Sequence, residues 1–154
     1  MRVKSAGQID RSRPLKFSFD GVSYSGFAGD TLASALLANN VRLIGRSFKY
    51  HRPRGVLTAG SEEPNALVTL RRGQSHDPNI RATQQELYGG LEAQSQNRWP
   101  SLNYDLLSIN DLAAPFISAG FYYKTFMWPK AFWERVYEPL IRRAAGLGAL
   151  DGAP

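Results

Sequence analysis

The sequence contains no cysteine, and this absence excludes several kinds of chemistry at once. Disulfides, thiolate metal sites, cysteine-held iron–sulfur clusters and cysteine nucleophiles cannot form from this chain. Only two histidines are present, His51 and His76, so the chain alone cannot build a three-histidine zinc site. Long apolar runs are also missing: no stretch approaches the roughly 20 residues of a membrane helix. The polar, basic start, 1–14, lacks the apolar stretch of a secretory signal, so we expect a cytoplasmic protein with no membrane partner.

The overall composition is that of a folded protein. The chain has 154 residues, of which 43% are hydrophobic and 21% charged, enough for one ordinary domain or a small domain with a tail. Its formal net charge is +6. A basic surface can dock on an acidic partner subunit or neutralise nucleic-acid phosphates, and charge alone does not separate the two.

The first elements are predicted from alternation and turn residues. Residues 15–19 alternate apolar and polar side chains, which indicates a strand with one buried face. Asp20-Gly21 is a strong hairpin turn signal because both positions tolerate a positive φ. Residues 22–27 alternate again and give the second strand. We treat 1–14 as a flexible segment before this hairpin.

A helix and a further strand are expected next. Gly29-Asp30 opens the helix, with Asp30 as its cap, and Asn39-Asn40 ends it. Its apolar stripe is formed by Leu32, Ala33, Leu36 and Leu37. Residues 66–70 read as a strand, 73–79 as a loop containing a solvated His76-Asp77 pair, and 80–82 as a possible resumption of the strand.

From residue 84 onward the pattern changes, with few strand signals and many large apolar groups. A short helix is predicted from Leu140 to Ala145, stopped by Gly146. Exposed aromatic surface usually marks an interface, so we expect the aromatic stretch to pack against another domain or subunit rather than form a ligand cage. The interaction candidates in this stretch are Phe121, Tyr122, Tyr123, Phe126 and Trp128.

The segment 42–54 is basic and interleaved with aromatic residues. It could be an electrostatic groove with stacking platforms for single-stranded nucleic acid. We favour a loop whose arginines pair with acidic residues of a neighbouring domain; contact with a bound phosphate or folate carboxylate is a third option. The candidate residues are Arg46, Phe48, Lys49, Tyr50, Arg52 and Arg54.

Three separated motifs resemble one known family. They are Arg-Ser-Phe-Lys-Tyr-His-Arg-Pro-Arg-Gly at 46–55 with Gly-Ser-Glu-Glu-Pro-Asn-Ala-Leu-Val at 60–68, Ser-Gln-Asn-Arg-Trp-Pro-Ser-Leu at 95–102, and Ala-Gly-Phe-Tyr-Tyr-Lys-Thr-Phe at 119–126. In this order they are similar to the alpha subunit of heterotetrameric sarcosine oxidase. The resemblance covers nearly the whole chain.

This resemblance implies an α+β fold, a ferredoxin-like β-grasp domain at 15–83, followed at 84–154 by an irregular or helical aromatic-rich arm. Cluster-bearing relatives carry Cys-x4-Cys-x2-Cys after the helix, the plant-type spacing. Laid on this sequence, those cysteines fall at Thr58, Glu63 and Ala66, none of which is a thiolate. We therefore expect a scaffold that keeps the loop without a cluster, with no catalytic residue, metal or cofactor of its own.

For the whole complex, the resemblance implies NAD, FAD, FMN and tetrahydrofolate as cofactors. The partners would be the rest of the alpha subunit and the beta, gamma and delta subunits. The complex would demethylate sarcosine with O2, producing hydrogen peroxide and 5,10-methylenetetrahydrofolate. The chain stops at Pro154, about where the family's dinucleotide-binding loop would begin, so we expect a fragment or shortened product.

Three features could suggest cofactor binding or catalysis, but a structural interpretation is favoured for each. Gly-Leu-Gly-Ala-Leu-Asp at 146–151 lacks the third glycine of a dinucleotide fingerprint and follows a helix, which favours a helix stop with a linker. Adjacent Glu62 and Glu63 are expected to point apart, into water or toward arginines. His51 has no carboxylate spaced to orient it, so we expect a hydrogen-bonding loop residue rather than a base.

The sequence therefore predicts an assembly module of an oxidoreductase subunit. Two alternatives stay open: the corresponding domain of a related amine-oxidising or cyanide-forming complex, and a free-standing basic module that binds nucleic acid.

Overall fold

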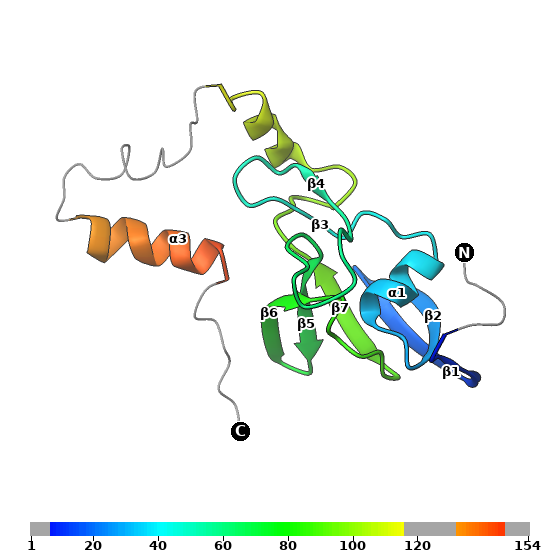
Figure 1. Cartoon of the computed structure of the whole chain (residues 1–154). Helices are drawn as coiled ribbons and strands as arrows, with labels where there is room; N and C mark the ends of the chain where they lie inside the picture. The colour runs from blue at the N-terminus through cyan, green and yellow to red at the C-terminus, as the bar shows by residue number, and fades with distance from the viewer. Residues whose placement is uncertain (1–6, 116–131, 147–154) are drawn as a thin grey trace.

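A computed structural model describes residues 7–115 and 132–146 of the chain, and its centre is a mixed five-stranded sheet. In spatial order the strands are β2 (Val22–Ala28), β1 (Asp10–Phe19), β7 (Leu91–Ser95), β5 (Leu67–Arg72) and β6 (Ser75–Arg81). β1 and β7 run parallel, and the other neighbours are antiparallel. With one helix packed beside it (Figure 1), the sheet gives the expected α+β architecture, consistent with a ferredoxin-like domain.

The predicted hairpin is confirmed. Asp20 and Gly21 have φ of 51° and 80°, so both turn residues adopt the left-handed conformation that the Asp-Gly pair favours. Phe17 and Phe19 point into the core. The first strand starts at Asp10, earlier than the expected residue 15, because the polar residues before Leu15 continue the strand beyond the buried part of the sheet.

Helix α1 (Leu32–Ala38) is confirmed with two changes in detail. Its N-cap is Thr31, in a capping box with Ser34. Asp30 is buried one residue earlier, and its side chain accepts hydrogen bonds from the Phe27 N–H and the Ser34 hydroxyl. Leu37 is 42% exposed. The helix ends at Asn39-Asn40 as predicted.

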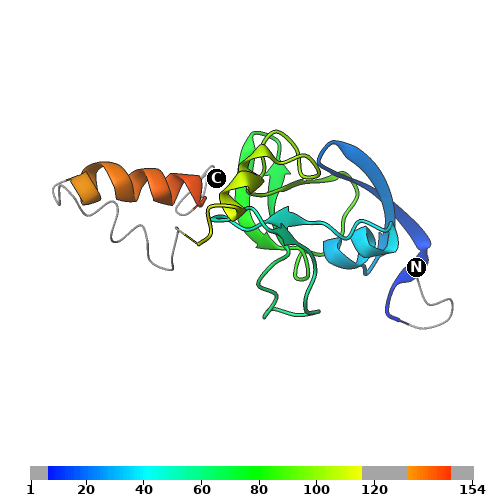
Figure 2. The same cartoon turned by 90° about the horizontal axis from the view of Figure 1, so that it is seen from above.

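Ala35 takes the buried position that was predicted for Leu37, because a close approach needs a small side chain. Gly26 of β2 faces it, and a Cβ at Gly26 would clash with Leu87 and crowd Ala35. Two small residues thus let the helix lie against the sheet. Figure 2 shows α1 packed close to β1 and β2 on one side of the sheet.

Two strands differ from the prediction. No strand was expected after residue 84, yet β7 lies in the middle of the sheet, between β1 and β5. Buried and more exposed residues alternate along β7, but two of the buried ones, Ala93 and Ser95, are small or polar. The alternation of large apolar and polar side chains that predicts a strand is therefore weak. The expected loop at 73–79 is mostly strand β6, with His76 and Asp77 in its ladder. As an edge strand, β6 tolerates Pro78 and an irregular register.

The core lies between α1 and the sheet and extends into the loops. Its buried hydrophobic members are Phe17, Phe19, Leu32, Ala33, Ala35, Leu36, Ile44, Ala66, Val68, Leu70, Ala82, Leu87, Leu91, Ala93 and Leu102. Leu87, Leu91, Ala93 and Leu102 come from beyond residue 83, so the core does not end with the predicted domain segment.

The remaining elements are short. β3 (Gly45–Arg46) and β4 (Pro53–Arg54) form a small hairpin, and η1 (Leu106–Asp111) is a 3-10 helix. Toward the C-terminus, the π-helical turn η2 (Trp133–Tyr137) leads into α3 (Glu138–Ala144), whose C-terminal end lies beside β6 (Figure 1).

The end of α3 agrees with the predicted helix stop. Gly146, with φ of 68°, follows the last turn. The side-chain amide of Asn79 in β6 donates to the carbonyl of Ala145 at 3.2 Å. In the described part of the chain, no helix has both the length and the apolar character needed to cross a membrane.

Candidate functional site

The loop at 57–66, here called the Glu63 loop, contains the three positions at which the family spacing would place cysteines. Glu63 is fully buried, with 0% of its surface exposed. Its Oε2 atom accepts hydrogen bonds from the N–H groups of Leu57 at 2.7 Å and Thr58 at 2.5 Å. Its Oε1 atom accepts from Asn65 at 2.8 Å and Ala66 at 3.1 Å. Thus four backbone donors surround one carboxylate.

This geometry corrects the prediction that Glu63 points into water or toward arginines, although Glu62 is exposed as expected. Burial alone would raise the pKa of the Glu63 carboxyl, because it disfavours the charged form. The hydrogen bonds from the four backbone N–H groups outweigh burial and hold the pKa below its ordinary value of 4.5. Glu63 is therefore a buried carboxylate anion at neutral pH.

Three further hydrogen bonds fix the Glu63 loop without using the carboxylate. The Thr83 hydroxyl donates to the carbonyl of Gly60 at 2.8 Å, and the Arg81 Nε donates to the main-chain carbonyl of Glu63 at 3.2 Å. The N–H of Ala82 donates to the carbonyl of Ala66 at 2.9 Å. The loop is thus tied to the last residue of β6 and to the two residues that follow it.

The donor set of this loop does not fit an iron–sulfur cluster. Such clusters need thiolate ligands, with imidazole as a replacement in some classes. Here the three positions present a hydroxyl, a carboxylate already saturated by backbone donors, and a methyl group: Thr58, Glu63 and Ala66. No group of three or more metal-ligating side chains is found in the residues that the structure describes.

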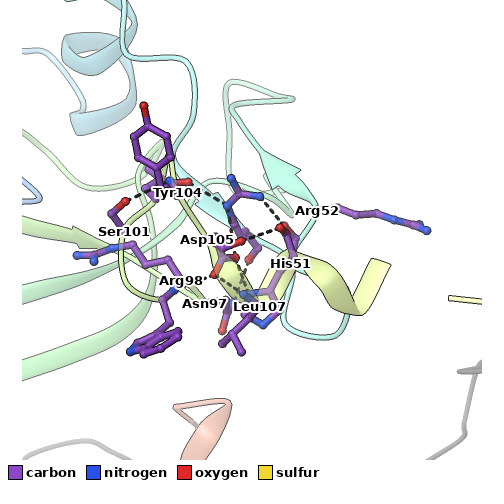
Figure 3. Close-up of polar contacts among 12 residues, drawn as sticks. His51, Arg52, Asn97, Arg98, Ser101, Tyr104, Asp105 and Leu107 are labelled. Carbon is purple, nitrogen blue, oxygen red and sulfur yellow. Dashed lines mark hydrogen bonds and ion pairs between the residues drawn. The ribbon is translucent and has the colours of Figure 1, made fainter. Parts of the chain in front are cut away.

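Another buried carboxylate, Asp105, lies at the N-cap of η1 and organises what we call the Asp105 cluster (Figure 3). The Nδ1 atom of His51 is 2.7 Å from Oδ2 of Asp105, and the Nε atom of Arg46 is 3.5 Å from the same oxygen. Oδ1 accepts from the N–H groups of Trp99 at 2.9 Å and Leu107 at 3.2 Å. The cluster therefore joins the β3–β4 hairpin to the segment that contains η1.

The Asp105 cluster corrects the expectation that no carboxylate orients His51. The partner lies 54 residues along the chain, so no local spacing could reveal it. Arg46 adds bonds to the carbonyls of His51 and Leu102, both at 2.9 Å. All these contacts hold two loops together, which agrees with the prediction of a hydrogen-bonding loop histidine.

The basic stretch 42–54 is partly neutralised within the chain. Besides the pair between Arg46 and Asp105, the Nε atom of Arg52 lies 2.6 Å from Oδ1 of Asp111. Lys49 and Arg52 both lie over the ring of Tyr50, 4.7 Å from its centroid. Two of the arginines thus find acidic partners in the same chain, where a neighbouring domain was expected.

The other candidates of this stretch, Phe48 and Arg54, line a groove of about 270 Å³ beside Asn65 and Gln96. Phe48 is exposed and Arg54 is half-buried. The aromatic candidates at 121–128 (Phe121, Tyr122, Tyr123, Phe126 and Trp128) lie outside the described residues.

Large apolar side chains are exposed along the segment that Asp105 anchors. We call them the apolar row; each is between 57% and 81% exposed, and they are Trp99, Tyr104, Leu106, Ile109 and Leu112. Leu106, Ile109 and Leu112 line one side of a groove of about 600 Å³ whose other side is the β3–β4 hairpin. The sequence did not reveal this surface because its apolar residues are spread among polar ones, whereas the aromatic stretch further along is denser.

Comparison with known proteins gives consistent results. The chain is 66% identical, over 96% of its length, to the sarcosine oxidase subunit alpha of Rhizobium meliloti (strain 1021). It is 49% and 43% identical, over 48% and 59% of its length, to the proteins of the same name from Corynebacterium sp. strains P-1 and U-96. The chain spans only 15%, 8% and 10% of the length of these three relatives.

A solved structure, the L-proline dehydrogenase from P. horikoshii, matches with a TM-score of 0.47 and 22% identity, covering 58% of this chain and 17% of that one. The family model described as "2Fe-2S iron-sulfur cluster binding domain" matches residues 12–98. This range contains the Glu63 loop and all five strands of the sheet, apart from the first two residues of β1. Because the match covers more than half of the chain, the chain belongs to the 2Fe-2S iron–sulfur cluster binding domain family, as a member without cysteines.

Proposed function

We propose that this chain is the N-terminal structural and assembly domain of a sarcosine oxidase alpha subunit. It would consist of a β-grasp domain without a cluster and an arm that packs against the rest of the complex. The complex would oxidise sarcosine to glycine in the cytoplasm with O2, yielding hydrogen peroxide and 5,10-methylenetetrahydrofolate. The 66% identity to one such subunit over nearly the whole chain supports this assignment.

The observation that carries the proposal is the apolar row. Contiguous exposed apolar surface is costly in water and commonly marks a protein interface. The row lies along one segment, beside a groove, and the Asp105 cluster holds that segment in place. An apolar surface on a segment that is held by a buried carboxylate is suited to docking on another folded domain.

The charge distribution supports a protein partner over nucleic acid. Arg46 and Arg52, in the middle of the basic stretch, are neutralised by Asp105 and Asp111. Arginines paired in this way are less available to phosphates. The relatives are oxidoreductase subunits by name, so the nucleic-acid alternative is not favoured.

In this proposal the chain contributes to assembly, and other parts of the complex bind the cofactors and carry out the reaction. NAD, FAD, FMN and tetrahydrofolate would be held by the rest of the alpha subunit and by the beta, gamma and delta subunits. The amine substrate would likewise be bound elsewhere. A complex that oxidises a related amine would use this domain in the same way.

The proposal is tested by charging the apolar row in the complete subunit. Leu106→Asp with Ile109→Asp places two carboxylates on the surface without touching the core, since both side chains are mostly exposed. We expect the complex to assemble at least about tenfold more weakly, because buried apolar anchors dominate interface energies. Size-exclusion chromatography and sarcosine-dependent peroxide production measure the loss.

The matched control is Val22→Asp, another aliphatic residue that is 53% exposed but lies outside both the row and the Glu63 loop. It should assemble and turn over as the unmodified complex does. Normal assembly of the Leu106 and Ile109 double variant would contradict the proposal, as would sarcosine oxidation by the isolated 154-residue chain.

A further inference from the structure

The backbone around Glu63 has the geometry of an anion-binding site. Four N–H groups from two stretches of the loop, 57–58 and 65–66, converge on the two oxygens of a single carboxylate. Converging backbone N–H groups form concave nests that bind anions through their partial positive charge. In the described residues no buried side-chain nitrogen or oxygen lacks a hydrogen-bond partner, so this site is saturated.

We propose that the Glu63 loop is an anion-binding site whose ligand is the chain's own Glu63 carboxylate. By the resemblance stated above, the carboxylate takes the second of the three positions at which cluster-bearing relatives carry a cysteine. In this chain the partner of the loop's N–H groups is thus a covalently attached anion. The chain can thus keep a cluster-binding loop while needing no metal to fold.

The shape of the loop does not depend on the carboxylate alone, and this makes the site a separable unit. The Thr83 hydroxyl, the Arg81 guanidinium and the Ala82 N–H hold the main chain at Gly60, Glu63 and Ala66. Truncating the Glu63 side chain would therefore leave the four N–H groups near their places, around an empty space. An anion from solution should then be able to occupy it.

The size of the vacated space specifies the ligand class. Glu63→Ala removes one methylene and one carboxylate, which together have the volume and charge of acetate. Formate is smaller and should bind more weakly, and benzoate should not fit. Acetamide has the shape of acetate, but its amino group would face two N–H donors where the site requires an acceptor.

The experiment uses the full chain at neutral pH and follows thermal unfolding by circular dichroism. Glu63→Ala should lower the Tm by about 5 °C or more, because four buried donors lose their acceptor. Sodium acetate should restore part of that loss in a saturable way. Acetamide, and sodium chloride at matched ionic strength, should not.

The unmodified chain and Glu62→Ala serve as controls, since Glu62 is the exposed neighbour. Neither should respond specifically to acetate. An equal acetate effect on all three proteins, or none on Glu63→Ala, would overturn the proposal.

A measurement on the unmodified chain covers the case in which Glu63→Ala does not fold. The amide protons of Leu57, Thr58, Asn65 and Ala66 should resonate downfield of random-coil positions and exchange slowly with deuterium. Fast exchange at these four amides would also refute the proposal. Neither test depends on the oxidase assignment, because assembly with other subunits is not measured.

Discussion

The Glu63 loop and the segment around Asp105 are both held by a buried carboxylate, but the partners differ. Glu63 is stabilised by the backbone of its own loop, within six residues on either side in sequence. Asp105 combines two backbone N–H groups with His51 and Arg46, which come from a hairpin 54 and more residues earlier. The first acid thus shapes a loop locally, and the second connects two distant parts of the chain.

The two buried carboxylates therefore differ in what they stabilise: one the folded core, the other the proposed docking surface. The Glu63 loop belongs to the core, with Ala66 among its buried members. The Asp105 segment bears the apolar row that we propose as the docking surface. Disturbing Glu63 should weaken the fold itself, whereas disturbing Asp105 should also release the surface that recognises other subunits.

The largest effect is expected from Asp105→Ala. It leaves Arg46 and His51 without their buried acceptor, and removing one partner of a buried ion pair costs about 3–5 kcal/mol. Urea unfolding of the chain measures this loss. Assembly of the complex should fall as well, and a variant that unfolds and assembles normally would show that Asp105 does not hold the segment.

Glu63→Gln should have the next largest effect. It keeps the shape but turns one acceptor oxygen into a donor that faces backbone N–H groups. Leaving buried donors unsatisfied costs about 1–3 kcal/mol, measured by the same unfolding curves. Glu62→Gln, on the exposed neighbour, should stay within about 0.5 kcal/mol of the unmodified chain. Equal losses in both variants would mean that the backbone donors are not what stabilises the loop.

Acid should weaken the unmodified chain more than Glu63→Gln. Because the folded-state pKa of Glu63 lies below its unfolded value, its stabilisation is fully present above about pH 4.5. It is lost as the pH falls through the lowered pKa. Charged groups at the loop include the exposed Glu62, Arg54, which lines a groove with Asn65, and Arg81, whose guanidinium donates to the main-chain carbonyl of Glu63.

Asp10, whose pKa is also lowered by its hydrogen bonds with Ser12, contributes in the same direction, and it is present in both proteins. The difference between the two unfolding curves from pH 6 down to pH 3 therefore isolates Glu63. Parallel curves over this range would contradict the assignment of a lowered pKa to Glu63.

The smallest effect is expected from Arg52→Ala. Its pair with Asp111 is half exposed on both sides, and such surface ion pairs contribute between 0 and about 1 kcal/mol. Unfolding in low and high salt should show little change, in contrast to Asp105→Ala. A loss comparable to that of Asp105→Ala would mean that burial is not what distinguishes the two pairs.

The parts of the fold that sequence predicted are those with local signals. Asp20-Gly21 specifies its turn through positive φ, and the helix between Asp30 and Asn40 follows from spacing and end residues. β7 was missed because Ala93 and Ser95 supply buried positions without bulk. Small inward residues suffice there, because backbone hydrogen bonds to β1 and β5 hold both edges of the strand.

The candidate site was predictable only in outline. The spacing of Thr58, Glu63 and Ala66 located the loop, but not the direction of the Glu63 side chain. That direction is set by where four backbone N–H groups point, which depends on the folded path of the loop. The pairing of His51 with Asp105 is a purely tertiary contact, for which the sequence holds no periodic signal.

The parallel pairing of β1 with β7 also constrains the order of events during synthesis. Asp20 at the end of β1 accepts hydrogen bonds from the N–H and hydroxyl of Ser95, which follows 75 residues later. While a ribosome is making the intervening chain, one edge of the first hairpin remains uncovered. Only when 91–95 have left the exit tunnel can the middle of the sheet close, so a shorter nascent chain exposes an unpaired strand edge of the kind that favours aggregation.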